Sequence, residues 1–147
     1  MAGKIFELEQ VLVYRREMEK LRKQEFAAAR QALEQANQKL KREEDVMHLL
    51  SEEFRRNQQD IGCIDDMRMY ANFFVRKRQE INCHKEHVES LDLAANEKRS
   101  DLMGASKEKK VLESLKEKKA AEFKRYMATK ERDFLDEISI QKKAKQT

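Results

Sequence analysis

The 147-residue sequence contains no proline and no tryptophan, and it contains only three glycines. Proline and glycine mark most chain reversals, so their scarcity excludes a fold built from many short elements. Hydrophobic residues make up 39% of the chain, whereas Asp, Glu, Lys and Arg together make up 41%. That is too little apolar side chain for a thick globular interior. The many Ala, Glu, Lys, Leu, Arg and Gln residues instead predict long helices.

Long hydrophobic runs are also missing. The apolar residues at 5–12 are interrupted by Glu and Gln, unlike the continuous apolar segment of a secretory signal. Apolar runs such as "FAAA" at 26–29 and "FFV" at 73–75 fall far short of the about 20 residues of a membrane-spanning helix. Two cysteines, Cys63 and Cys83, are too few for a disulfide scaffold. We therefore expect a cytosolic protein without direct membrane insertion.

Motifs for catalysis or cofactor binding are absent. The sequence has no glycine-rich phosphate loop and no H-E-x-x-H zinc motif. Cys83 and His87 stand four residues apart, but two ligands make a weak metal site. Carboxylate pairs such as those at 65–66 and 136–137 fall on predicted rods that offer no pocket for acid–base chemistry. We expect a non-enzymatic protein with no cofactor and no metal.

Apolar residues in the first half repeat every three and four residues, which is the spacing of a coiled-coil seam. Nine of the eleven positions stepped from Phe26 are apolar. The positions are Phe26, Ala29, Leu33, Ala36, Leu40, Glu43, Met47, Leu50, Phe54, Asn57 and Ile61. Upstream, Ile5, Leu8 and Leu12 keep this frame. Val11, Tyr14, Met18 and Leu21 sit one residue off it, which predicts a wide or locally rewound stripe.

The second half carries a matching stripe, with ten of fourteen stepped positions apolar. They are Met67, Tyr70, Phe74, Lys77, Ile81, His84, Val88, Leu91, Ala95, Lys98, Leu102, Ala105, Lys109 and Leu112. Between the halves, Gly62 is suited to positive φ after the first helix, and Asp65 or Asp66 to capping the second. The sequence thus predicts an all-α fold, a long antiparallel two-helix coiled-coil hairpin.

We predict one domain over 1–147, with a first helix at about 3–60, a turn at about 61–65, a second helix at about 66–140 and a frayed basic tail at 141–147. If residue i faces about residue 127 − i, Ile5 lies near Glu122 and the second helix overhangs the N-terminus. Residues 123–140 then extend about 27 Å beyond it. Their apolar residues, Phe123, Tyr126, Met127, Phe134, Leu135 and Ile138, have no internal partner, which predicts a binding surface.

The net charge of +4 arises in the C-terminal part of the chain. Residues 107–147 contain thirteen Lys or Arg and eight Asp or Glu, a local +5, whereas residues 1–106 carry −1. A basic helical end suits nucleic acid, an anionic membrane or an acidic protein. Because Lys and Glu interleave throughout, we interpret these charges as the solvated face of a coiled coil, and we expect no nucleic acid.

Two local features have alternative interpretations. Tyr70, Phe73 and Phe74 share one helix face, where they form either seam packing near the turn or a docking site for a partner. Gly104, in "LMGASK", is either a tolerated helix-interior glycine, at a cost of about 1 kcal/mol, or a bend in the second helix.

Four stretches of the sequence together resemble a known family. The opening pattern "F-x-L-x-x-V-L-x-x-R-x-x-E" is present as Phe6, Leu8, Val11, Leu12, Arg15 or Arg16, and Glu19. A turn at Gly62, aromatic residues at 70–74 and a closing "F-L-D-E" at 134–137 follow. The whole chain resembles the bacterial flagellar export protein FliJ family.

The resemblance implies a component of the flagellar type III protein export apparatus that serves motility. Such a protein is cytoplasmic and associates peripherally with the inner membrane at the flagellar base. Family members are similar in shape to the central stalk of rotary ATPases and insert both helix ends into the hexameric export ATPase. They also contact the cytoplasmic domain of the export gate and bind export chaperones. Through these contacts the stalk would promote ring assembly and activity and couple the ring to the gate.

Matched residue by residue, the resemblance implies two contact sites. The ATPase-ring contact consists of Ile5, Leu8, Leu12, Arg15, Arg16, Phe123, Tyr126, Lys130, Phe134, Asp136 and Ile138. The export-gate contact consists of Tyr70, Phe73, Phe74 and Lys77.

Three alternatives share the hairpin. An export chaperone, or the stalk homologue of a virulence secretion system, would differ in the ATPase that it binds. A basic coiled coil that binds nucleic acid would lose affinity steeply with salt. A scaffold that homodimerises through the overhang would show a concentration-dependent mass.

Overall fold

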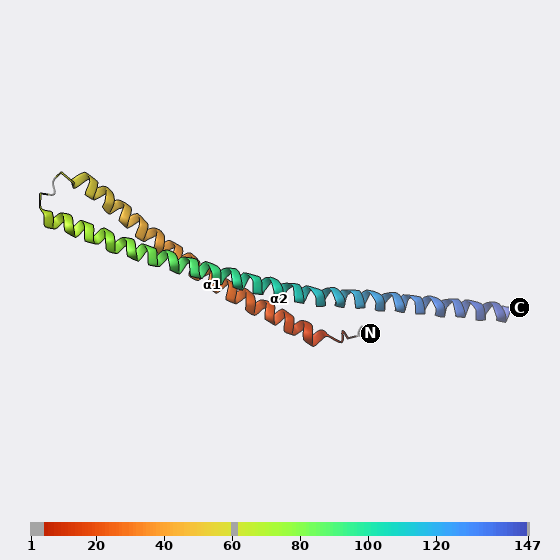
Figure 1. The fold of residues 1–147 in the computed structure, drawn as a ribbon. Coiled ribbons are helices and arrows are strands. Elements are labelled where there is room, and N and C mark those ends of the chain that lie inside the picture. The colour runs from red at the N-terminus through yellow and green to blue at the C-terminus, as the bar shows by residue number, and fades with distance from the viewer. Residues whose placement is uncertain (1–4, 60–61, 147) are drawn as a thin grey trace. The chain divides into compact units, whose positions relative to one another are not determined.

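The computed structural model describes residues 5–59 and 62–146, which form two helices and no strand: α1 (Glu9–Asn57) and α2 (Ile64–Gln146) (Figure 1). The chain divides into two compact units. Unit 1 comprises residues 1–21 and 103–147, and unit 2 comprises residues 22–102. In each unit a segment of α1 packs antiparallel against a segment of α2. The predicted all-α, antiparallel two-helix hairpin is confirmed.

The seam of unit 2 is the apolar stripe that the sequence predicts. Every predicted α1 position from Phe26 to Phe54 is at least half-buried, as is every predicted α2 position from Tyr70 to Leu102. Ile81 and Ala95 are the most buried, each with 6% of its surface exposed. Asn57 and Met67, the predicted seam positions beside the turn, are exposed. Side-chain burial along this stripe stabilises the helix pair more than helix propensity does.

The seam of unit 1 contains more charge. Leu12 is fully buried, but the next positions of the same frame are Arg15 and Glu19, and Glu19 is only 7% exposed. Lys109 of α2 holds the Glu19 carboxylate at 2.9 Å. The seam therefore keeps the frame of Leu12 and is not rewound. Of the off-frame residues, Met18 is half-buried whereas Val11, Tyr14 and Leu21 are exposed, so the predicted widening of the stripe is found only at Met18.

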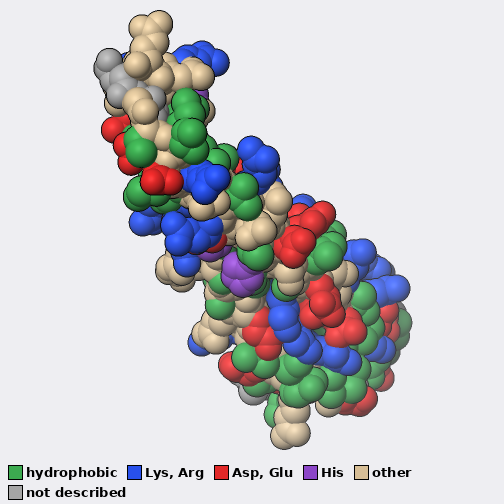
Figure 2. All heavy atoms as spheres, turned by 60° about the vertical axis from the view of Figure 1, so that its left-hand side comes forward, with side chains coloured by type: hydrophobic (Ala, Val, Ile, Leu, Met, Phe, Trp, Pro, Cys, Tyr) green, Lys and Arg blue, Asp and Glu red, His purple; other side chains and the backbone are tan. Residues whose placement is uncertain are grey.

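Further ion pairs join the two helices of unit 1. Lys116 lies 2.8 Å from Glu9, Glu113 lies 3.4 Å from Arg16, and Glu108 pairs with Arg15. From Glu9–Lys116 through Arg16–Glu113 to Glu19–Lys109, the partner number on α2 falls as the α1 number rises, as an antiparallel pair requires. Figure 2 shows acidic and basic side chains interleaved on the surface.

The helix bounds differ from the predicted ones at both ends. The carbonyl of Phe6 accepts a hydrogen bond from the Glu9 amide at 3.1 Å, so residues 7 and 8 form a turn and α1 begins at Glu9. Residue 3, the predicted start, lies outside the described residues. α2 continues as helix to Gln146, through most of the segment predicted to fray. Its last turn carries Lys143 and Lys145, which favourably oppose the helix dipole.

The connection between the helices differs from the prediction in two respects. Gly62 does not adopt positive φ. α2 begins at Ile64, and the Cys63 carbonyl accepts the first helical hydrogen bond from the Met67 amide at 3.3 Å. Asp65 and Asp66 thus lie inside the first turn instead of capping it, where their charge favourably opposes the helix dipole. Residue 61 of the predicted turn lies outside the described residues.

Within unit 1, α2 overhangs the start of α1. Glu9, the first residue of α1, pairs with Lys116, whereas α2 continues to Gln146. Beyond Lys116, only Phe123 and Ile138 are half-buried, and the other described side chains are exposed. We call residues 117–146 the overhang.

Candidate functional site

The overhang carries an open groove of about 930 Å³ on one face of α2. It is lined by Phe123, Lys124, Met127, Ala128, Lys130, Glu131, Asp133, Phe134 and Glu137. The floor is apolar, because Phe123, Met127 and Phe134 recur at intervals of four and seven residues and so share a face.

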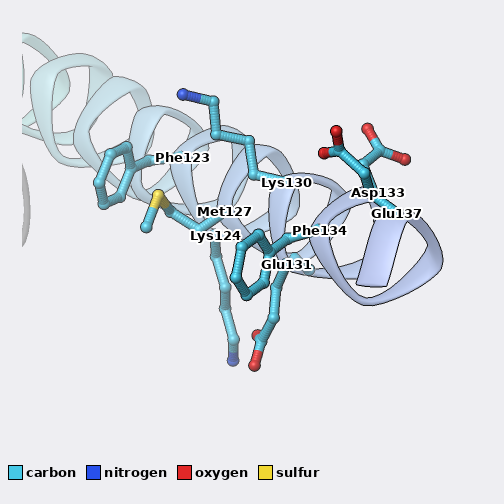
Figure 3. Close-up of a pocket in the computed structure, with 9 residues that line it drawn as sticks. Phe123, Lys124, Met127, Lys130, Glu131, Asp133, Phe134 and Glu137 are labelled. Carbon is cyan, nitrogen blue, oxygen red and sulfur yellow. The ribbon is translucent and has the colours of Figure 1, made fainter. Parts of the chain in front are cut away.

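Charged side chains flank this apolar floor on both sides. In Figure 3, Lys124 and Glu131 point to one side, and Lys130, Asp133 and Glu137 point to the other. Each flank therefore carries both a positive and a negative charge. An apolar strip between mixed-charge flanks is suited to another amphipathic helix or a shallow protein surface.

Tyr126 and Lys130 form a local pair on the overhang. The Lys130 ammonium nitrogen lies 4.9 Å from the centre of the Tyr126 ring. A hydrogen bond between the two side chains raises the pKa of Lys130 above its ordinary value of 10.5. The pair places a fixed positive charge beside an aromatic ring that is 54% exposed, a combination often found at protein interfaces.

The ring-contact residues predicted on α2 lie together on the overhang. Tyr126, Lys130, Phe134 and Asp136 are exposed, and Ile138 is half-buried like Phe123. The prediction omitted Met127, although the residue belongs to the predicted apolar stripe. It also omitted the flanking charges Lys124, Glu131, Asp133 and Glu137, because isolated polar positions give no periodic signal.

The ring-contact residues predicted on or before α1 are not equivalent. Leu12 is fully buried in the seam, so its side chain is not a contact surface in this structure. Ile5 is 82% exposed and Leu8 is 39% exposed, so both offer apolar surface. Arg15 and Arg16 are engaged by Glu108 and Glu113.

Unit 2 contains a second candidate surface, an aromatic cluster beside the turn. Phe54 of α1 lies 5.1 Å from Tyr70 and 5.8 Å from Phe74, measured between ring centres. The ring centres of Phe73 and Phe74 lie 6.5 Å apart, in an edge-to-face arrangement. The guanidinium carbon of Arg76 lies 5.8 Å from the ring centre of Phe73. Tyr70 and Phe74 thus pack in the seam, whereas Phe73 lies at its edge.

An open depression of about 710 Å³ adjoins this aromatic cluster. It is lined by Leu50, Asn57, Asp66, Met69, Tyr70, Asn72, Phe73 and Arg76. Of the predicted gate-contact set, Tyr70 and Phe73 line this depression. Phe74 and Lys77 do not line it, but they lie 6.5 and 6.0 Å from the Phe73 ring centre, so the four residues are close together. Phe54 joins the cluster from the other helix. Lys77 forms an ion pair with Glu43 across the seam, which lowers the pKa of Glu43 and raises that of Lys77.

The described residues, 5–59 and 62–146, contain no group of three or more His, Cys, Asp or Glu that could hold a metal ion. No helix in the same ranges is long and apolar enough to cross a membrane. Cys63 and Cys83 are both free and exposed.

Comparison with known proteins identifies a family that the chain matches. The family described as "Flagellar FliJ protein" matches residues 4–147, essentially the whole chain. No curated protein and no solved structure matches the chain. The family match agrees with the helical hairpin, and it associates the chain with flagellum biogenesis and protein export. The chain belongs to the flagellar FliJ protein family.

Proposed function

We propose that this chain is a non-enzymatic central stalk of the flagellar export ATPase hexamer. The overhang, with Ile5 and Leu8, binds the ring and promotes its assembly and activity. The aromatic cluster beside the turn contacts the cytoplasmic domain of the export gate, and export chaperones bind the same protein. The protein acts in the cytoplasm, associated peripherally with the inner membrane at the flagellar base.

The observation that carries this proposal is the uncovered apolar groove of the overhang. Within this groove Phe134 is 61% exposed and Met127 is 43% exposed, and no other described segment of the chain covers them. Fully burying one such side chain is worth about 1.5–3 kcal/mol, so a few of them can anchor a protein complex. A ring with a central opening is one partner that a single projecting helix can enter.

The aromatic cluster supports the second contact. Phe73 is held by Phe74 at 6.5 Å and is flanked by the cations of Arg76 and Lys77, at 5.8 and 6.0 Å from its ring centre. An ordered aromatic ring beside positive charge suits an acidic protein surface with an apolar pocket. The ATPase ring and the gate would thus bind different units of the chain.

The decisive experiment measures ATP hydrolysis by the cognate export ATPase, with and without this protein, at moderate salt. Wild-type protein should stimulate hydrolysis, and the double variant Phe134→Ala, Ile138→Ala should lose most of that stimulation. Leu49→Ala, Leu93→Ala is a matched control, because these two apolar residues are 65% and 68% exposed and lie in unit 2.

The same variants separate the proposed ends. Phe73→Ala should keep the ATPase stimulation and weaken binding to the gate domain. If Phe73→Ala abolishes stimulation while the overhang variant retains it, the two contacts are assigned to the wrong ends. If wild-type protein fails to stimulate an ATPase that does form rings, the stalk function is refuted and the chaperone function is favoured.

A further inference from the structure

Unit 1 carries a second apolar stripe that the hairpin does not cover. Val11, Tyr14, Met18 and Leu21 follow steps of three, four and three residues along α1, each one residue before a seam position. Val11 is 42%, Tyr14 56% and Leu21 45% exposed, so the stripe is largely open to solvent. A repeat with this spacing is typical of a helix face that packs on another helix.

An ion pair shows which residues of α2 flank that stripe. Arg16 and Glu113 each follow a seam position by one residue, and they meet at 3.4 Å on one side of the helix pair. Residues that precede seam positions must then lie on the other side of both helices. On α2 these are Gly104, Glu108, Val111 and Leu115. One side of unit 1 is therefore charged, and the opposite side is largely apolar.

The ion pairs between the helices of unit 1 set the levels of these residues. Glu9 pairs with Lys116, Arg16 with Glu113 and Glu19 with Lys109, and both helices rise by about 1.5 Å per residue. Counted from these pairs, Tyr14 lies within about one helical turn of the level of Val111. By the same count, Leu21 lies within about one turn of the level of Gly104.

We propose that this apolar side binds a second copy of the chain, so that two copies of unit 1 form an antiparallel four-helix bundle. A two-fold axis parallel to the helices places α1 of one copy against α2 of the other. Rotation about this axis leaves each residue at the same height along the helices, so residues that are level within one copy are also level between copies. Tyr14 then faces Val111 of the second copy, which is 66% exposed in the single chain. Leu21 faces Gly104 of the second copy. The bundle covers both stripes at once.

Gly104 gives this arrangement a specific fit. A glycine inside a helix destabilises that helix, so a glycine is expected there only where a side chain would not fit. A Cβ atom built on Gly104 would meet nothing within 4 Å in the single chain, so packing within the hairpin does not require a glycine at this position. Facing the second copy, the missing side chain leaves a recess close to the level of Leu21. A large side chain packing over a small one is how helix surfaces interlock.

Charge agrees with the same arrangement. Glu17 stands on the outer edge of the apolar stripe of α1, and Lys107 on the corresponding edge of α2. Counted from the same ion pairs, Glu17 of one copy comes within about one turn of Lys107 of the other. The opposite two-fold, with its axis across the helices, would place α1 against α1, so Glu17 would have no Lys107 beside it. Glu108, on the apolar side itself, is already paired with Arg15.

Sedimentation of the full chain, from low to high micromolar concentration, tests whether this dimer forms. The wild-type mass should rise from monomer to dimer, and Tyr14→Lys should weaken association about tenfold or more. Leu93→Lys, at an exposed apolar residue of unit 2, should leave association unchanged. Gly104→Ala should also weaken it while raising the melting temperature of the dilute monomer, which separates loss of the surface from loss of folding.

Disulfide trapping tests the geometry, in a background where Cys63 and Cys83 are serine. A Tyr14→Cys chain mixed with a Val111→Cys chain should give a cross-linked heterodimer. Arg16→Cys mixed with Glu113→Cys, on the opposite side of unit 1, should not. A chain that stays monomeric at the highest concentration overturns the proposal. So does a dimer that Phe134→Ala, Ile138→Ala disrupts and Tyr14→Lys does not, because the interface would then be the overhang.

Discussion

Glu19 of α1 and Lys109 of α2 form an ion pair, with a shortest N–O distance of 2.9 Å, inside the seam of unit 1. Glu19 is 7% exposed, and the Lys109 side chain is 20% exposed. A charge pair shielded from water contributes little net stability, because its attraction is offset by the cost of desolvation. Its larger effect is on alignment, since a slipped pairing leaves a charge without its partner.

Removing one member of this pair should therefore lower the free energy of unfolding more than removing both members does. We expect Glu19→Ala to lower the free energy of unfolding by about 1–3 kcal/mol, because Lys109 loses the carboxylate that compensates its desolvation. The double variant Glu19→Leu, Lys109→Leu should be close to wild type or more stable. Urea unfolding monitored by circular dichroism measures both, and Glu34→Ala, at an exposed position of α1, is the control. A double variant as unstable as Glu19→Ala would contradict this account.

Leu12 and Ile5 should respond differently to truncation. Leu12→Ala removes a fully buried side chain, and we expect a loss of about 2–4 kcal/mol. Ile5 is 82% exposed, so Ile5→Ala should change stability by less than about 0.5 kcal/mol. Hydrogen exchange of residues 9–21 should accelerate only in Leu12→Ala. Equal effects from the two variants would show that Leu12 is not the anchor of this segment.

The sequence predicted the seam residues more accurately in the apolar segments than in the charged one. From Phe26 to Leu102 the three–four spacing placed nearly every seam residue correctly, because a two-helix fold has one seam and apolar burial dictates it. Between residues 9 and 21 the seam includes Arg15 and Glu19, so the apolar residues alone were divided between two adjacent frames and did not single out one face. The available signal was Lys109, which already stood on the predicted seam of the second helix.

The candidate sites were predictable to different degrees. The overhang followed from unequal helix lengths, and the aromatic cluster from the spacing of Tyr70, Phe73 and Phe74. The burial of Leu12 also followed from its position in the three–four frame of the seam. The resemblance nevertheless implied that Leu12 contacts the ATPase ring, because a family resemblance does not show which side chains are exposed. The prediction of a single domain over 1–147 stays a prediction, as do the individual contact residues.

The aromatic cluster should separate stability from binding. Phe74 lies 5.8 Å from Phe54 across the seam, so Phe74→Ala should destabilise the protein by about 2–4 kcal/mol. Phe73 lies at the edge of the seam, and Phe73→Ala should cost less than about 1 kcal/mol while weakening binding to the gate domain. Thermal melting together with a binding titration distinguishes the two. Normal gate binding by Phe73→Ala would remove this residue from the contact.

The Glu43–Lys77 pair predicts a pH dependence of stability. Lys77 lowers the pKa of Glu43 below its ordinary value of 4.5, so the unfolded chain takes up the proton first as the pH falls. The contribution of Glu43 is therefore fully present above about pH 4.5 and is lost as the pH falls through the lower, folded-state pKa. Glu43→Gln should be less stable than wild type at pH 7, and the difference should shrink toward pH 3. A difference that stays constant with pH would mean that the charge of Glu43 contributes nothing.

Gly104→Ala should stabilise the monomer. Gly104 lies inside α2 without positive φ, and an added Cβ atom would meet nothing within 4 Å. Alanine restricts the unfolded chain and favours the helix, so the free energy of unfolding should rise by about 0.5–1 kcal/mol. Chemical unfolding at a concentration low enough to exclude association measures this gain. Ser100→Ala is the matched control, because serine at this exposed position of the same helix costs less than glycine, and its gain should be smaller. A loss of stability in Gly104→Ala would show that this glycine is needed within the single chain, for instance as a bend, and its fit to a second copy would then not be the reason for its position.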